Sequence, residues 1–151
     1  MKENSQKLFK EGVSLINRGY SKEAVRFLEK SLESGGKNSA SLSFLGLAIA
    51  RSGGDLLRAE KLCLDAIKVD FYWPRFYVNL AKVYLIWGKK SLAIKALEKG
   101  LKLDHDNRDI LKELEKMGLR AGPCIPFISR ANPINKYLGI VFQRSKTASG
   151  R

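Results

Sequence analysis

The sequence predicts an all-α fold, an α-solenoid of three helix-turn-helix repeats followed by a capping helix and an irregular C-terminal extension. Small residues recur at a period of 34 or 35 residues, and apolar residues within each period are three or four apart, as on one helix face. Glycines stand where these apolar stripes stop. One helix pair cannot bury its apolar face alone, so the pairs are expected to stack.

Two series of small residues carry the repeat. One returns at spacings of 35 and then 34 residues and the other at 34 and then 35, so one extra residue lies before Gly54 in the second repeat. Large side chains at Gly12, at Ala24 and at their equivalents would hold two antiparallel helices apart, so close helix approach is predicted there. The first series is Gly19, Gly54 and Gly88 with Ala24, Ala59 and Ala93, and the second is Gly12, Gly46 and Ala81.

We expect the repeats at about 5–38, 39–73 and 74–107 and a capping helix at about 108–117. Pro74 suits the first turn of a helix, because its missing N–H costs nothing there. Asp106 or Asn107 can cap the last helix, and Gly118 can end it. The apolar face of this helix consists of Ile110, Leu111, Leu114 and Met117.

The chain resembles the tetratricopeptide repeat family over about residues 5–107, and with the capping helix the predicted repeat domain spans 5–118. The matching residues are Leu45-Gly46, Leu80-Ala81, Tyr84, Ala66 and the three glycine–alanine pairs that follow each first helix. Glu11 departs from the family pattern, which has leucine there. The resemblance implies a superhelix whose first helices line a concave groove.

The resemblance also implies a non-enzymatic adaptor that binds a protein or peptide of acidic character in the groove. Apolar contact and positive charge would come from the first helices of the three repeats. The expected partner-binding residues are Phe9, Val13, Asn17, Leu47, Arg51, Arg75, Asn79 and Lys82.

Family members that bind chaperone tails hold a C-terminal carboxylate with basic and asparagine side chains. The matching positions here are Phe9, Val13, Phe44, Arg75 and Asn79, and of these only Arg75 keeps the chemistry. Chaperone-tail binding of this kind is therefore not expected.

Charge suggests an alternative. The chain has 28 basic and 15 acidic residues, a net charge of +13, and residues 75–151 hold 16 of the basic and 6 of the acidic ones. The basic half is thus a candidate for electrostatic binding of nucleic acid or an anionic membrane.

The C-terminal extension, 119–151, begins with a helix-breaking stretch, Gly122-Pro123-Cys124-Ile125-Pro126. It is too apolar for a free tail, so we expect it either to fold back on the repeats or to dock on a partner, as in a subunit of a larger assembly. The candidate docking residues are Phe127, Ile128, Ile134, Tyr137, Leu138 and Val141.

Other chemistry lacks support in the sequence. No secretory signal or membrane-spanning run is present, and Cys63 and Cys124 form no CxxC pattern, so we expect a cytoplasmic protein with no metal, cofactor or catalytic residue. His105 is read as a surface residue and Cys63 as an inert core residue. Phe71-Tyr72-Trp73 resembles a nucleic-acid stacking cluster, but packing is the expectation at a repeat junction.

Overall fold

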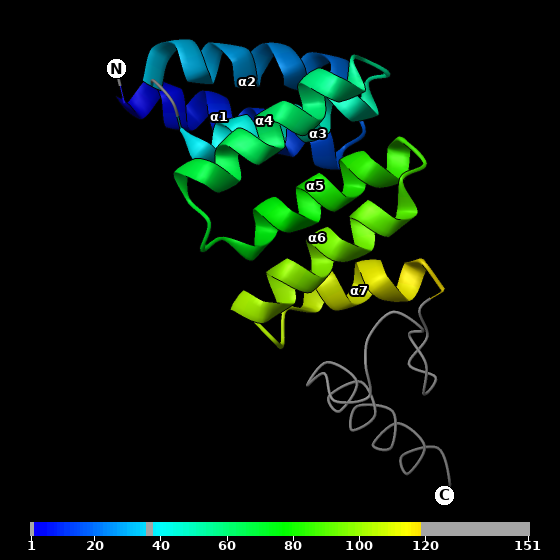
Figure 1. Ribbon diagram of the computed structural model, residues 1–151. Coiled ribbons are helices and arrows are strands. Elements are labelled where there is room, and N and C mark those ends of the chain that lie inside the picture. The colour runs from blue at the N-terminus through cyan, green and yellow to red at the C-terminus, as the bar shows by residue number, and fades with distance from the viewer. Residues whose placement is uncertain (1, 36–37, 119–151) are drawn as a thin grey trace, which may run out of the picture. The chain divides into compact units, whose positions relative to one another are not determined.

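The computed structural model describes residues 2–35 and 38–118, and every regular element in these ranges is an α-helix (Figure 1). The predicted all-α class and the repeated helix pairs are confirmed. Helices α1 to α6 lie in one compact unit and α7 lies in a second. The helices are α1 (Lys2–Asn17), α2 (Ser21–Gly35), α3 (Ser39–Arg51), α4 (Leu56–Val69), α5 (Pro74–Ile86), α6 (Lys90–Leu103) and α7 (Arg108–Lys116).

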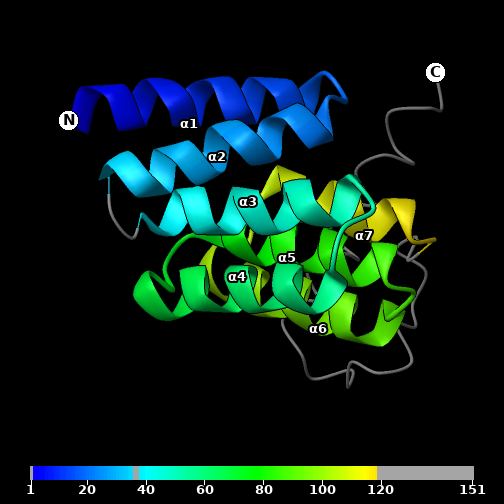
Figure 2. The same cartoon turned by 90° about the horizontal axis from the view of Figure 1, so that it is seen from above.

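The first six helices form three antiparallel pairs, α1 with α2, α3 with α4, and α5 with α6. Helix α3 lies beside α2 on one side and beside α5 on the other, so the pairs stack in chain order (Figure 2). This is the arrangement in which each pair buries the apolar face of its neighbour.

A glycine in the left-handed conformation turns the chain within each pair. Gly19, Gly53 and Gly88 have φ values of 90°, 78° and 76°, which a residue without Cβ adopts at little cost. The second of these is Gly53, one residue earlier than the predicted Gly54. The extra residue of the second repeat therefore lies after the turn glycine, between Gly53 and the start of α4, where it leaves the helix-ending bond from Gly54 N–H to Ile49 O intact at 2.9 Å.

The small residues inside the pairs allow the close approach that the sequence predicts. A Cβ at Gly46 would lie 2.6 Å from the carbonyl oxygen of Ala59 and 2.7 Å from the sulfur of Cys63. A Cβ at Gly12 would lie 2.7 Å from Leu28. A side chain at Gly46 would press on the backbone of α4, and one at Gly12 would displace the buried Leu28 side chain.

A buried network of serines joins the first pair to the second. The hydroxyl of Ser5 donates to the carbonyl oxygen of Ser31 (2.8 Å), and the hydroxyl of Ser31 lies 3.0 Å from both the carbonyl oxygen of Ser5 and the hydroxyl of Ser41. These bonds satisfy three hydroxyls that would otherwise be costly to bury. The period of small residues gives no sign of this network.

Glu11, which departs from the family pattern, is exposed on α1. It shares a polar face with Asn4, Lys7 and Ser14, all of them exposed. The leucine of the family pattern is therefore not needed at this position, because the face of α1 that carries it is solvated.

Helix α7 spans the residues at which a helix is predicted. Leu111 and Met117 of the predicted apolar face are half-buried, but Glu113, expected on the polar face, is buried as well. The side chain of Asn107, rather than Asp106, accepts a hydrogen bond from the N–H of Ile110 at 3.1 Å. Ile110 and Leu114 are buried, and Gly118 follows the helix with φ 73°. Its role as a capping helix remains a prediction, and Phe127, Ile128, Ile134, Tyr137, Leu138 and Val141 lie outside the described residues.

Candidate functional site

The partner-binding residues predicted on α1 lie along one helix face. Phe9 and Val13 are half-buried and Asn17 is exposed. The ring of Phe9 meets the ring of Phe44 on α3 edge to face, with centroids 5.6 Å apart and planes at 78°. Phe9 is therefore held in place while part of it stays accessible.

Arg51 stands at the last turn of α3 and reaches back to α1. Its guanidinium Nη1 donates to the carbonyl oxygen of Ile16 at 3.4 Å, and the residue is otherwise exposed. This bond brings a positive charge beside Asn17, at the end of the α1 stripe. The structure thus gathers Phe9, Val13, Asn17 and Arg51 on adjoining first helices.

Leu47 and Asn79 are not part of the accessible surface. Leu47 is 3% exposed and Asn79 is 1% exposed, and the amide Nδ2 of Asn79 donates to the hydroxyl of Ser43 at 3.0 Å. Both residues face the packed interior between neighbouring helices, which corrects their placement on a partner-binding surface. Periodicity alone could not separate the two faces, because almost the whole of α3 from Ser43 to Ala50 is buried.

Arg75 and Lys82 lie on α5, seven residues and so about two turns apart. Arg75 is exposed and Lys82 is half-buried. Between them they give α5 two cations and no acidic residue. We define the first-helix face as Phe9, Val13, Asn17, Arg51, Arg75 and Lys82, the predicted residues that remain accessible.

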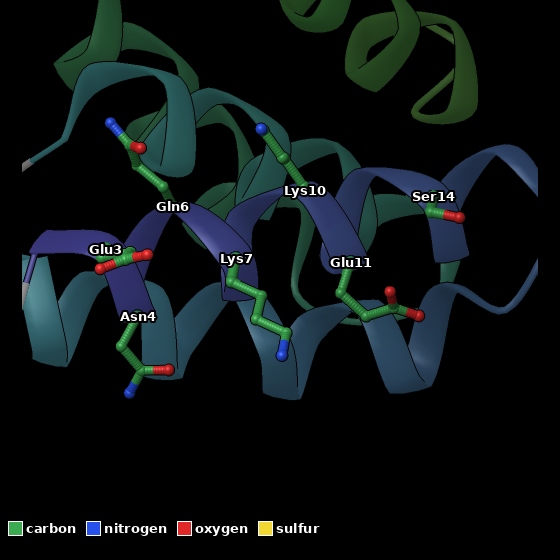
Figure 3. A pocket seen from close by; sticks show the side chains of 7 residues that line it. All are labelled: Glu3, Asn4, Gln6, Lys7, Lys10, Glu11 and Ser14. Carbon is green, nitrogen blue, oxygen red and sulfur yellow. The ribbon is translucent and has the colours of Figure 1, made fainter.

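An open polar depression lies on α1 (Figure 3). Lys7, Glu11 and Asn4 point one way from the helix and Gln6 and Lys10 the other (Figure 3). None of the residues of the first-helix face lines it. A shallow hollow built from one helix and lined by exposed polar side chains has few buried groups to orient a ligand. Its lining residues are Glu3, Asn4, Gln6, Lys7, Lys10, Glu11 and Ser14.

The aromatic residues in the turn from α4 to α5 are exposed, so the prediction that they pack at this repeat junction is wrong. Phe71, Tyr72 and Trp73 are all at least half exposed. Aromatic side chains at a repeat junction usually pack against the next repeat, but these three lie in the turn at the end of the helix pair and are exposed. A comparison with the equivalent turn at 105–107 could have indicated their exposure, because that turn is wholly polar.

Cys63 is buried on the inner side of α4, and burial raises the pKa of its thiol to about 12, with the nearby Glu60 carboxylate adding to the shift. Such a thiol is not a nucleophile near neutral pH. Glu60 accepts a hydrogen bond from the Tyr84 hydroxyl at 2.7 Å; burial and this bond raise the pKa of Tyr84.

Among residues 2–35 and 38–118, no group of three or more histidine, cysteine, aspartate or glutamate side chains is placed to hold a metal ion. None of the described helices is both long enough and apolar enough to cross a bilayer.

Comparison with known proteins gives one family match and several structural neighbours. A tetratricopeptide repeat model matches residues 74–107. No curated protein sequence matches the chain. Residues 74–107 are the third of the predicted repeats.

Solved structures with the same fold share about a fifth of their residues with this chain. The first tetratricopeptide repeat domain of human RPAP3 is 20% identical, with a TM-score of 0.68, over 79% of this chain and 93% of that one. The first such domain of Spaghetti (RPAP3), bound to the HSP90 peptide SRMEEVD, is 20% identical with a TM-score of 0.65, over 79% and 94%. A mutant of the Thermobaculum terrenum O-GlcNAc transferase is 21% identical with a TM-score of 0.71, over 95% of this chain and 26% of that one.

Proposed function

The chain is a tetratricopeptide repeat protein, and on this premise we propose that it is a non-catalytic adaptor whose first-helix face binds an extended segment of a partner protein. The observation that carries the proposal is the accessible Phe9 ring, which is fixed against Phe44 while the cations Arg51, Arg75 and Lys82 stand on the neighbouring first helices.

The chemistry of this face selects the partner. Phe9 and Val13 offer a half-buried apolar site at one end, where an aliphatic or aromatic anchor would lose contact with water. Arg75 and Lys82 offer positive charge on α5 to carboxylates further along the segment. Leu47 and Asn79 are buried in α3 and α5, the helices that carry Arg51, Arg75 and Lys82, so the backbone of this face is already fixed and little conformational entropy of the backbone is lost when a partner binds.

Spaghetti (RPAP3) binds an acidic chaperone peptide on the same fold. We propose an acidic segment for this chain as well, but with a different motif. The positions that would clamp a terminal carboxylate are apolar at Phe9, Val13 and Phe44, and the amide of Asn79 is engaged with Ser43. Specificity would then come from the apolar anchor, with charge adding affinity and speed of association.

The test is a peptide selection with the full-length protein, followed by affinity measurement on the variants. Peptides from a random displayed library would be enriched, synthesised and titrated by fluorescence anisotropy. We expect an apolar residue followed by acidic residues. Val13→Asp should weaken binding by about tenfold or more because it places a charge at the apolar anchor, and Arg75→Glu with Lys82→Glu should weaken it further at low salt.

The matched control is Lys22→Glu with Lys30→Glu, which makes the same charge change on the exposed side of α2. Selected peptides that bind all variants equally would contradict the proposal. So would peptides that lose binding only with the α2 control, because the site would then lie on the second helices.

A further inference from the structure

The turn between α4 and α5 carries three neighbouring aromatic side chains that the fold leaves in water. Phe71, Tyr72 and Trp73 are 50%, 69% and 58% exposed, and Val69 beside them is 59% exposed. Because α5 and α6 run antiparallel, the exposed Leu103 at the end of α6 lies at this same end of the helix pair (Figure 1). Monomeric proteins rarely expose so contiguous an apolar group without using it.

An equivalent turn of the same chain shows that a turn of this length forms without aromatic residues. The turn after α6 has the same length, and His105, Asp106 and Asn107 stand where the three aromatic residues stand. Asn107 caps its helix through its side chain, as Asn38 caps α3, whereas Trp73 holds the cap position of α5 and makes no capping hydrogen bond. The α4–α5 turn therefore gives up a stabilising cap in favour of an exposed ring.

The exposed rings are held rather than loose. The Phe71 and Tyr72 rings lie against each other with centroids 3.9 Å apart, and the Trp73 ring stacks over the buried Phe76. The hydroxyl of Tyr77 donates to the carbonyl oxygen of Phe71 at 3.1 Å. Pre-organised aromatic side chains lose little entropy on binding, which is typical of interaction surfaces.

Lysines flank the turn on the outer sides of α4 and α6. Lys61 and Lys68 on α4 recur 34 residues later as Lys95 and Lys102 on α6, and all four are exposed. The exposed Lys99 lies between the last two. The acidic residues on these outer sides, Asp65 and Glu98, are half-buried, and Asp65 pairs with Lys68 at 3.1 Å. The outer side of the second and third repeats is therefore cationic next to an apolar, aromatic edge.

We propose that the aromatic turn (Val69 and Phe71 to Trp73) and the outer lysines of α4 and α6 dock on an anionic lipid bilayer. Tryptophan and tyrosine rings are favoured at the level of the lipid headgroups, where one part of the ring is apolar and another is polar. Val69 and Phe71 enter the acyl boundary, and the lysines meet anionic headgroups. This surface shares no residue with the first-helix face, although Arg75 follows Trp73 closely in the chain.

Nucleic acid fits the same residues less well. Phe71 and Tyr72 stack on each other and leave no space for a base between them. The exposed aliphatic side chains of Val69 and Leu103 have no counterpart in a strand of nucleotides, whereas the acyl boundary of a bilayer accepts them.

The experiment uses the tryptophans as reporters. The chain has two, Trp73 and Trp87, so Trp87→Phe leaves Trp73 as the sole tryptophan of the full-length protein. Its emission would be recorded with vesicles of phosphatidylcholine alone and of equal parts phosphatidylcholine and phosphatidylserine. A shift to shorter wavelength with the mixed vesicles, and quenching by brominated acyl chains, would support insertion of the turn.

Co-sedimentation with the mixed vesicles would test the residues. We expect Tyr72→Ser with Trp73→Ser, and separately Lys95→Glu with Lys99→Glu, to lower the vesicle-bound fraction by about tenfold. The matched controls are Tyr20→Ser, another half-exposed aromatic residue, and Arg26→Glu with Lys30→Glu, at the equivalent outer positions of the first repeat. Circular dichroism would verify that all the variants keep their helices.

Two results would overturn the proposal. One is vesicle binding that survives loss of Tyr72 and Trp73, which would assign the membrane contact to another basic part of the chain. The other is a Trp73 emission that ignores vesicles but shifts with a single-stranded oligonucleotide or with a peptide bound by the first-helix face.

Discussion

The amide Nδ2 of Asn79 on α5 donates a hydrogen bond to the hydroxyl of Ser43 on α3 across 3.0 Å, and both side chains are buried. The bond ties α3 of the second repeat to α5 of the third. A residue whose position suggests partner binding is thereby committed to the junction between repeats.

Asn79→Ala should lower the free energy of unfolding by about 1–3 kcal/mol, because it leaves the Ser43 hydroxyl buried without this partner. Urea denaturation of the full chain measures the change. Asn79→Ala combined with Ser43→Ala should cost less than the two single changes added together. Strictly additive costs would show that the bond contributes nothing, and Asn17→Ala, at an exposed position, should have little effect.

Gly46→Ala should destabilise the protein by about 1–3 kcal/mol, although alanine is the better helix former. The new methyl group would meet the Ala59 carbonyl oxygen at 2.6 Å, which is backbone and cannot rotate away. The midpoint of thermal unfolding reports the loss. Ala81, the equivalent residue of the third repeat, is buried and accommodated, so Ala81→Gly is the control and should show only the ordinary cost of glycine within a helix. An unchanged midpoint for Gly46→Ala would mean that α3 and α4 lie further apart than described.

Asn38→Ala should cost about 1 kcal/mol, because the Asn38 side chain accepts hydrogen bonds from the N–H groups of Ala40 and Ser41 at 2.9 and 3.4 Å at the start of α3. Asn38→Ser retains a capping oxygen and should be nearly neutral. Equal losses in the two variants would assign the effect to something other than the cap. Chemical denaturation monitored by circular dichroism distinguishes these outcomes.

Stability should fall as the solution becomes alkaline. Burial raises the pKa of Cys63 from 9.0 to about 12, and the pKa values of Tyr84 and Tyr77 are also raised by burial. The folded chain then keeps protons that the unfolded chain releases, so the free energy of unfolding decreases as pH rises above 9.0, by at most about 1.4 kcal/mol per pH unit for each group. Cys63→Ala should make this decline shallower between pH 9 and 10. In that range the thiol of the unfolded chain loses its proton, and the tyrosine hydroxyls do so only at higher pH.

The same burial predicts slow chemistry at the thiol. In a Cys124→Ser background Cys63 is the sole cysteine, and it should react with a disulfide reagent near neutral pH only as fast as the protein opens. Urea should accelerate the reaction steeply. Rapid labelling of the folded protein would contradict the described packing of α3 on α4.

The HSP90 peptide SRMEEVD, which binds the first repeat domain of Spaghetti (RPAP3), should bind this chain weakly and in a strongly salt-dependent manner. Of the positions that would hold its terminal carboxylate, only Arg75 is an accessible cation. Phe9→Lys with Val13→Asn should strengthen binding by restoring polar side chains at two of these positions. Tight binding by the unaltered protein would show that the clamp of this chain uses other residues. Fluorescence anisotropy with a labelled peptide provides the affinities.

The architecture follows from spacings within the chain. Recurring Gly12 and Gly46, the turn glycines and the apolar stripes each act between residues close in the chain, so their spacing is enough to predict paired helices. The burial and low reactivity of Cys63 could be predicted in the same way, because a residue on the inner apolar stripe of a second helix is buried in any such helix pair.

Tertiary structure decided which residues are accessible. Helices α3 and α5 each pack against several neighbouring helices, so Leu47 on α3 and Asn79 on α5 are buried although their positions match a partner-binding pattern. Conversely, Tyr72 and Trp73 lie in the turn at the end of a helix pair, and more than half of each side chain is exposed. Burial depends on what the other repeats place beside a side chain, and a local pattern of residues does not contain that information.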